Sequence, residues 1–271
     1  MSKLIFLVLI LVSTSIYSAT EKELRFPIST RGFRDLLKKD YAKKKVRTDY
    51  YFDLYTESGY LLKSLEQPLK FRLKIKKRHQ YEMAVSKLIN TELFPNDQVM
   101  RTIKETESIK FEISQALGKQ LVRLSEELFL HLRYRNFNQI DEKVSDLNNH
   151  LKKIITDHQL TDLIPYLEQT FVVANKSRKE RYSRKLVIDG VTYKTKIGRT
   201  IEKNSSGLNL GRYEWEGEPK GTNQIPNDIF ESVWELLDLH QKPARFFSRS
   251  RSTTGIYYHR LWKSYFDRIK I

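Results

Sequence analysis

Polar and apolar residues alternate along much of residues 21–112 and again between residues 171 and 218. This period of two is typical of strands that bury one face. It is clearest in Glu23–Ile28, Tyr50–Leu54, Leu69–Lys76, Tyr81–Lys87, Ser108–Ile113, Arg178–Ile188, Val191–Ile201 and Arg212–Glu218. Asp189-Gly190, between two of these runs, predicts a tight hairpin turn. The pattern predicts a protein rich in antiparallel strands.

Between the two strand-rich regions, the apolar residues recur every three or four positions instead. Leucine and isoleucine follow this spacing from Ile113 to Leu132, and a second stripe runs from Val144 to Ile155. Both stripes predict amphipathic helices, so we expect a helical insertion over residues 113–170. A capping pair, Asn227-Asp228, precedes another apolar stripe, and we expect helices over residues 227–271.

The N-terminus is typical of a secretory signal peptide. Lys3 supplies the positive charge, Leu4–Val12 form an apolar run, and small or polar residues follow to Ala19. The run is shorter than the roughly 20 residues that span a bilayer, so no transmembrane span is expected in the mature protein. We expect a signal peptide over residues 1–19 and one mature domain over 20–271, exported to the periplasm or secreted. Cleavage after Ser15 or Ser18 and retention of the segment as a strand are the alternatives.

Charge and composition narrow the function classes. The chain carries 49 Lys and Arg against 33 Asp and Glu, a formal charge of +16, which concentrates anions near its surface. This excess alone does not choose between phosphates, nucleic acid and an acidic membrane. The six histidines show no H-E-x-x-H spacing, so a zinc site of that type is not expected.

Charged residues also alternate within the predicted strands. Two acidic rows are Glu21-x-Glu23-x-Arg25 and Glu214-x-Glu216-x-Glu218, and two basic rows are Arg72-x-Lys74-x-Lys76 and Lys179-x-Arg181. Each row lines one face of its strand. One interpretation is a set of solvated sheet faces. The other is a closed sheet whose interior pairs acids with bases and suits a metal-bound polyanion, because five carboxylates brought together would otherwise repel one another.

Seven segments carry a family resemblance when taken in chain order. They are Glu21–Phe26 (E-x-E-x-K with Arg for Lys), Thr48–Asp53 with Tyr60–Lys63 (D-x-Y-[YF]-D, then G-x-L-L), Phe71–Lys74 (L-R-x-R), Tyr81–Lys87 (a strand with one Lys), Arg101 with Glu105 and Glu107 (R-x-E-x-E), Lys179–Arg181 (K-x-R) and Leu210–Glu218 (L-G-x-[FY]-x-E-x-E). In this order they resemble the CYTH superfamily, the triphosphate tunnel metalloenzymes. One departure is that Tyr193–Arg199 lacks the family's acid on the penultimate strand, and Glu202, further along, is the only candidate to compensate for it.

The resemblance implies an α+β fold: an eight-stranded antiparallel β-barrel forming a triphosphate tunnel, with the helical insertion and C-terminal helices. It implies Mg²⁺ or Mn²⁺ as the cofactor. The implied metal ligands are Glu21, Glu23, Glu214, Glu216 and Glu218, and the implied phosphate-binding residues are Arg72, Lys74, Lys87, Arg101, Lys179 and Arg181. Glu21, Glu23 and Arg25 are the expected catalytic residues.

The expected function is metal-dependent hydrolysis of triphosphate or a related polyphosphate-containing small molecule, as in CYTH-like triphosphatases. The alternative is an exported, non-catalytic module that binds polyphosphate or a nucleotide in the same tunnel. A third interpretation is surface binding of nucleic acid or of the cell envelope near Arg245, Arg249 and Arg251. It ranks last because the sequence contains no nucleic-acid-binding motif.

Overall fold

The computed structural model describes residues 17–39, 41, 43–76, 80–95, 99–203, 206–222, 225–226, 228–247 and 256–269. Its strands are β1 (Tyr17–Ile28), β2 (Lys43–Thr56), β3 (Gly59–Tyr60), β4 (Leu69–Ile75), β5 (Tyr81–Pro95), β6 (Met100–Ile113), β7 (Phe171–Ile188), β8 (Val191–Lys203) and β9 (Asn209–Pro219). Eight of them form an antiparallel ring in the order β2-β4-β5-β6-β1-β9-β8-β7, and pairing of β7 with β2 closes it. The predicted eight-stranded barrel is confirmed, with the short β3 attached to β2.

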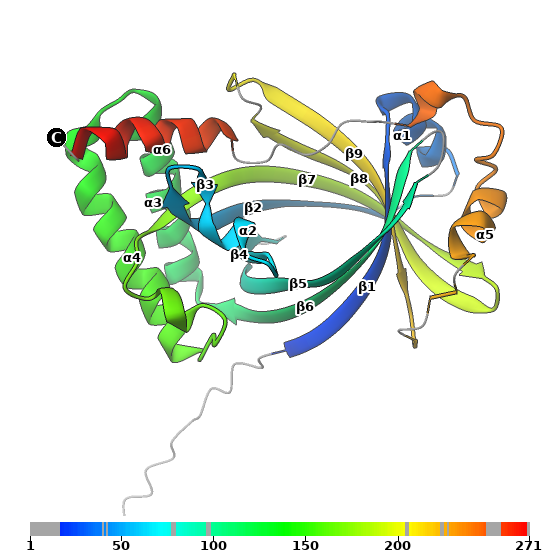
Figure 1. Ribbon diagram of the computed structural model, residues 1–271, viewed down its shortest axis with the longest axis horizontal. Helices are drawn as coiled ribbons and strands as arrows, with labels where there is room; N and C mark the ends of the chain where they lie inside the picture. The colour runs from blue at the N-terminus through cyan, green and yellow to red at the C-terminus, as the bar shows by residue number, and fades with distance from the viewer. Residues whose placement is uncertain are drawn as a thin grey trace, which may run out of the picture.

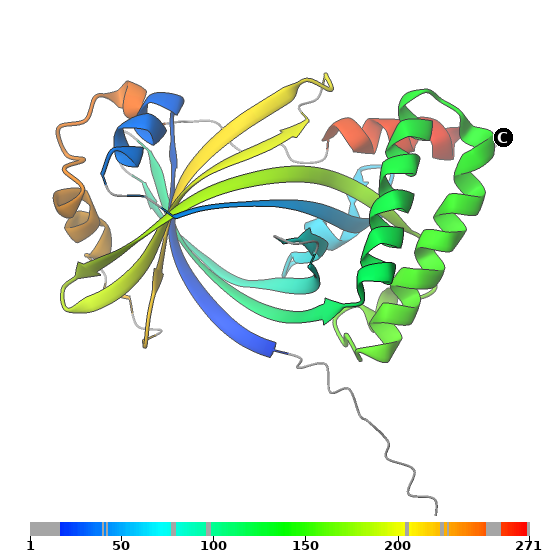
Figure 2. The same ribbon diagram turned by 180° about the vertical axis from the view of Figure 1, so that it is seen from behind.

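The described helices lie mostly at two ends of this barrel (Figures 1 and 2). They are α1 (Thr30–Leu37), α2 (Leu61–Ser64), α3 (Gln115–Arg133), α4 (Ile140–Asp157), α5 (Ile229–Leu236) and α6 (Ile256–Ile269). The helices α3, α4 and α6 gather at one end, and α1 and α5 lie at the other. The region between β6 and β7 is therefore helical, and so is much of the chain after β9. None of the described helices is long and apolar enough to cross a membrane.

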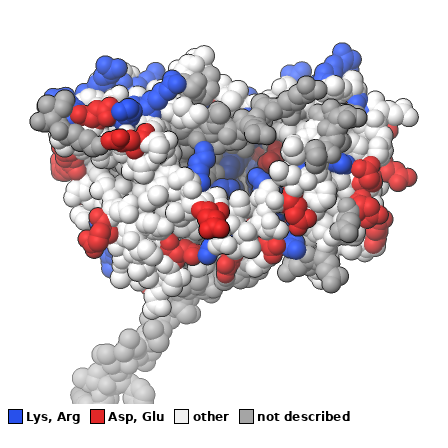
Figure 3. Space-filling view, viewed as in Figure 1, with Lys and Arg blue, Asp and Glu red and all other residues white. Residues whose placement is uncertain are grey.

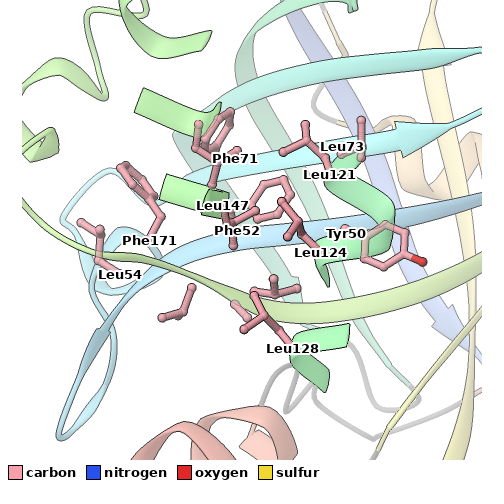
Figure 4. Packing of buried hydrophobic residues seen from close by; sticks show 14 of the residues in the cluster. Tyr50, Phe52, Leu54, Phe71, Leu73, Leu121, Leu124, Leu128, Leu147 and Phe171 are labelled. Carbon is pink, nitrogen blue, oxygen red and sulfur yellow. The ribbon is translucent and has the colours of Figure 1, made fainter. Parts of the chain in front are cut away.

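Alternation along the strands separates an apolar exterior from a charged interior. In β2, Tyr50, Phe52 and Leu54 point outward into a cluster with α3 and α4, including Leu121 and Leu147 (Figure 4). Burying these side chains stabilises the contact between barrel and helices, at roughly 1.5 to 3 kcal/mol for each large apolar residue. The intervening residues of β2 must then point inward.

A second apolar cluster covers the opposite side of the barrel wall. Phe26 of β1 stacks on Trp215 of β9, with ring centroids 4.9 Å apart, and meets the edge of Trp234 from α5 at 4.7 Å. The indole Nε1 of Trp215 donates a hydrogen bond to the hydroxyl of Tyr41 at 2.9 Å. Both main clusters of buried apolar residues thus lie outside the ring, which leaves its interior to polar side chains.

Most of the predicted signal peptide, residues 1–16, lies outside the described residues. Tyr17, Ser18 and Ala19 form the start of β1 and pair with Lys110, Ile109 and Ser108 of β6. The proposed cleavage point after Ala19 thus falls within a strand of this fold, and the signal peptide stays a prediction.

A substitution at Gly118 would test how α3 packs on the barrel. A Cβ at this position would lie 2.1 Å from Cγ of Tyr81 on β5. In an exposed helix, Gly→Ala stabilises by roughly 1 kcal/mol, but here the added methyl has no space. We expect Gly118→Ala to lower the free energy of unfolding by about 1 to 3 kcal/mol in urea titrations. Gly59→Ala, where no atom lies within 4 Å, is the control and should change it little. A stabilised Gly118→Ala would contradict this packing.

Candidate functional site

A cavity of about 1150 Å³ lies inside the barrel and opens as a hollow with Lys and Arg side chains in its floor (Figure 3). Its described lining contains four acidic residues, Asp53, Glu202, Glu214 and Glu216, and twice as many basic ones. The basic residues are Arg25, Lys63, Lys70, Arg72, Lys104, Lys179, Arg181 and Arg212. A cleft with walls mostly of one sign focuses the field and attracts ions of the opposite sign. The cavity is therefore suited to a polyanion.

Arg25 of β1 lies at the centre of the predicted acidic rows. Its Nε donates to Glu23 at 3.1 Å, and its Nη1 is 3.4 Å from a carboxylate oxygen of Glu214 and 3.8 Å from one of Glu216. Strand pairing brings these groups together, because Arg25 lies opposite Glu216 in the register of β1 and β9. Arg181 of β7 donates to Glu216 at 2.6 Å. The structure thus brings together both acidic rows and one of the basic rows.

The surroundings shift the pKa values of Glu214 and Glu216 in opposite directions. Burial would raise the pKa of Glu216, but Arg181 and Arg25 outweigh burial and lower it. Enclosure by the barrel raises the pKa of Glu214, and the adjacent Glu216 carboxylate raises it further. Glu214 is therefore the carboxyl group in this row that holds a proton more readily than an ordinary glutamate.

A second cluster surrounds Asp49 of β2. This side chain is fully buried, and its carboxylate lies 2.9 Å from Lys179, 3.0 Å from Arg47 and 3.9 Å from Arg72. Burial alone would raise the pKa of Asp49, but the three cations hold it well below the usual range. Asp49 thus fixes Arg72 and Lys179, two of the predicted phosphate-binding residues, at the cavity wall.

Tyr51 faces the same cluster, two residues along β2 from Asp49. Its hydroxyl lies 2.5 Å from Nζ of Lys179. Burial would raise the pKa of Tyr51, but Lys179 and then Arg72 act in the opposite direction, and the pKa is lowered to about 7. Asp49 and Tyr51 were not among the predicted site residues, although both lie on the inward face set by the alternation of β2.

The predicted site residues divide into three groups in the structure. Those that line the cavity are Arg25, Arg72, Lys179, Arg181, Glu214 and Glu216. Glu21, Glu23, Lys74 and Glu218 carry their charges on inward-facing strand positions beyond its described lining, and each forms an ion pair. The third group, Lys87 and Arg101, lies outside the barrel.

The expectation that Lys87 and Arg101 face the tunnel is wrong. Lys87 of β5 follows the inward-facing Ser86 and points to the outer face, where it pairs with Asp162 at 3.4 Å. Arg101 of β6 donates to Glu231 of α5 at 2.7 Å, and its guanidinium lies 5.3 Å from the centroid of the Phe230 ring. Both residues lie one position away from the inward set of their strands, and a shift of one residue reverses the face.

Lys70 and Lys104, two lysines that were not selected from the matched motifs, also line the cavity. Lys70 of β4 precedes Arg72 by two residues, and Lys104 of β6 lies opposite Glu23 in register. Among the described residues, no carboxylate lies within ion-pairing distance of either ammonium group. Enclosure by protein and the nearby Arg25 and Arg72 lower the pKa of Lys70 to about 8. The signal was available, since Lys70-x-Arg72-x-Lys74 continues the basic alternation.

The acids fit a divalent metal only in part. Nζ of Lys196 on β8 lies 3.4 Å from Glu23, 3.3 Å from Glu218 and 3.8 Å from Glu216. Within the described ranges, no group of three or more His, Cys, Asp or Glu side chains is placed to hold a metal. Glu214 and Glu216 still offer oxygen ligands, and one buried carboxylate oxygen of Glu216 has no hydrogen bond to a described residue. Mg²⁺ is commonly bound by one or two carboxylates together with substrate phosphates, and this pair fits that mode.

Glu202 does not replace the acid that the penultimate strand lacks. It forms an ion pair with Arg212 of β9 and accepts a hydrogen bond from the side-chain amide of Asn175 at 3.2 Å. The inward position of β8 that faces Glu216 is occupied by Lys196 instead. The strand therefore presents a cation where the resemblance implies a carboxylate.

Comparisons with known proteins assign no family. No family model matches the chain, and no curated protein matches it. Among solved structures, the PH1819 protein from Pyrococcus horikoshii OT3 is 16% identical, covering 92% of this chain and 99% of that one with a TM-score of 0.37. The Pct1 RNA triphosphatase of S. pombe, solved in complex with the Spt5 CTD, is 11% identical, covering 94% and 84% with a TM-score of 0.32. These scores are too low to transfer an activity.

The low pKa of Tyr51 predicts a distinct spectroscopic titration. We expect one of the 15 tyrosines to ionise near pH 7 in tyrosinate difference absorbance. The unfolded value is about 10, so ionisation stabilises the folded state fully above about pH 10, and this contribution is lost as the pH falls through about 7.

Tyr51→Phe should abolish this transition. Tyr258→Phe should retain it, because burial raises the pKa of Tyr258 to about 12. A wild-type protein with no tyrosine titration below pH 9 would contradict the described contact between Tyr51 and Lys179.

Proposed function

We propose that the barrel binds a triphosphate or a related polyphosphate chain and hydrolyses one of its phosphoanhydride bonds, as a CYTH-like tunnel phosphohydrolase. The observation that supports this most is the two ammonium groups of Lys70 and Lys104, which have no carboxylate partner among the described residues, in a cavity that Glu214 and Glu216 also line. Cations with no carboxylate partner are available to an anion. Acids beside them can share a divalent ion with that anion.

Binding follows from the types of cation that line the wall. Arg72 and Arg181 can each donate two parallel hydrogen bonds to phosphate oxygens, whereas Lys70, Lys104 and Lys179 act as point charges. Asp49 holds Lys179 and Arg72 in place, so the wall is preorganised and loses little side-chain entropy on binding. These cations would contact the phosphate chain, so they do not define the organic part of the substrate.

Hydrolysis would use the residues at the acidic side of the cavity. A bound Mg²⁺ or Mn²⁺, held by Glu214 and Glu216, would supply neutralising charge and polarise a water molecule. Glu214, whose pKa is raised, is our candidate to accept the proton of the attacking water. Lys70, Lys104 and Arg72 would stabilise the charge on the phosphate oxygens during the transfer.

The same proposal includes export. The support is the N-terminal sequence, with Lys3, the apolar Leu4–Val12 and the small residues up to Ala19. A periplasmic or secreted protein would meet its polyphosphate substrate outside the cytoplasm.

One observation favours the alternative of a non-catalytic polyphosphate- or nucleotide-binding module. Several acids near the cavity already have cationic partners: Glu23 pairs with Arg25 and Glu202 with Arg212. Glu216 likewise pairs with Arg181 at 2.6 Å. Carboxylates engaged in this way are weaker metal ligands and weaker bases, and a tunnel of this kind can bind without reacting.

Binding should depend on the lysines inside the barrel and not on the lysine outside it. We expect Lys70→Met and Lys104→Met each to weaken inorganic triphosphate binding by about 10- to 100-fold, because a hydrogen bond to a charged group contributes roughly 1.5 to 3 kcal/mol. Calorimetric titration with Mg²⁺ present measures this. Lys87→Met makes the same substitution on the outer face and should leave the affinity unchanged. Equal losses in all three variants would contradict the assigned faces.

Catalysis should require the two cavity glutamates. We expect wild-type protein to release phosphate from inorganic triphosphate, ATP or thiamine triphosphate with Mg²⁺ or Mn²⁺ and not with EDTA. The Glu214→Gln/Glu216→Gln variant should lose release by at least about 100-fold while still binding the substrate. Folded wild-type protein that binds triphosphate and releases no phosphate from any of the three would instead support the binding module.

A further inference from the structure

Lys196 holds an unusual place among the charged groups of the interior. It comes from β8, where it lies opposite Glu216 of β9 in the strand register. Its ammonium is within 4 Å of three carboxylates, those of Glu23, Glu216 and Glu218. The side chain is 14% exposed. A single positive charge therefore occupies the point where carboxylates of two strands, β1 and β9, converge.

As the described residues lie, with Lys196 between them, the three carboxylates are not placed to hold a metal ion. Each also has other basic neighbours: Arg25 beside Glu23 and Glu216, Arg181 beside Glu216, and Lys220 beside Glu218. These neighbours lie on β1, on β7 and just after β9, so none of them comes from β8. Among the described cations, the ammonium of Lys196 is the one that all three acids share. A divalent ion between them would need to displace it, because two cations so close together repel strongly.

The pairing of β8 with β7 and β9 restricts how far Lys196 can move. It lies in the middle of β8, with its neighbours paired to β7 on one side and to β9 on the other. Moving the ammonium out of the acid row would expose three carboxylates to one another at short range. Its position is therefore determined by the closed sheet and by the charge that it neutralises.

We propose that Lys196 is a tethered cation that takes the place of a divalent ion between Glu23, Glu216 and Glu218. The wild-type protein then has no divalent-cation site of its own. A divalent ion binds only together with polyphosphate, through Glu214, Glu216 and phosphate oxygens. This last step rests on the proposed function, whereas the exclusion of metal by Lys196 does not.

The test measures Mn²⁺ binding in the absence of phosphate, through the electron paramagnetic resonance signal of free Mn²⁺. Lys196→Met removes the charge and keeps much of the side-chain volume. We expect the variant to gain one Mn²⁺ site at least about 100-fold tighter than any in the wild type, since the number of unneutralised carboxylates sets the affinity of such sites. Mn²⁺ should also raise the melting temperature of the variant and not that of the wild type.

Four further variants make the result specific. Lys194→Met removes the same charge two residues away on the same strand, from a side chain with no ion pair to a described residue, and should gain no site. Lys196→Arg keeps the charge and should exclude Mn²⁺. Lys196→Met/Glu216→Gln should lose the site that the single variant gained. Lys196→Gln, which keeps a hydrogen-bond donor, provides a second neutral substitution for the same comparison.

The outcomes separate this inference from the proposed function. Wild-type protein that binds Mn²⁺ as tightly as Lys196→Met would overturn the inference, as would folded neutral variants at position 196 that gain no site. Absence of triphosphate binding and of phosphate release would overturn the proposed function, and the Mn²⁺ comparison would still decide the role of Lys196.

Discussion

Closure of the barrel is the constraint on which the rest of this structure depends. In a closed antiparallel sheet, every second residue must point inward, so the charged rows of β1, β2, β4, β7, β8 and β9 all face one enclosed space. Such a density of charge is tolerable only when opposite signs meet. Asp49 between Arg47 and Lys179, and Glu216 beside Arg181, show how neighbouring strands supply the partners.

The balance of acidic and basic side chains also determines where the cavity can bind an anion. Where acids and bases balance, as around Asp49, the ion pairs hold side chains in fixed positions. Where they do not balance, as at Lys70 and Lys104, positive charge remains for a ligand. Apolar packing on the outside, from Phe52 against α3 and from Phe26 against α5, stabilises the ring without occupying its interior. Stability and binding are thus assigned to opposite faces of the same strands.

Sequence alternation located the interior well wherever a strand carried several charges in a row. Arg72, Arg181, Glu214 and Glu216 line the cavity as their spacing indicated. The motif resemblance failed for Lys87 and Arg101, which were chosen by similarity to a motif and not by their place in the alternation. An isolated charge on a strand does not reveal its face, because the pairing register decides it and one residue of shift reverses it. Lys70 was missed for the converse reason, since it fell outside the matched motif.

The sequence by itself determined the strand-rich fold, the helical insertion and the presence of acidic and basic rows, because these follow from local periodicity. Only the tertiary structure decided which charges meet. Contacts such as Lys196 with Glu23 join residues 173 positions apart, through strands that come together when the ring closes. Such contacts depend on strand order and register, and these are set by cooperative packing of the whole sheet rather than by any local pattern. The partner of each charge, and so the chemistry of the cavity, therefore emerged only from the folded barrel.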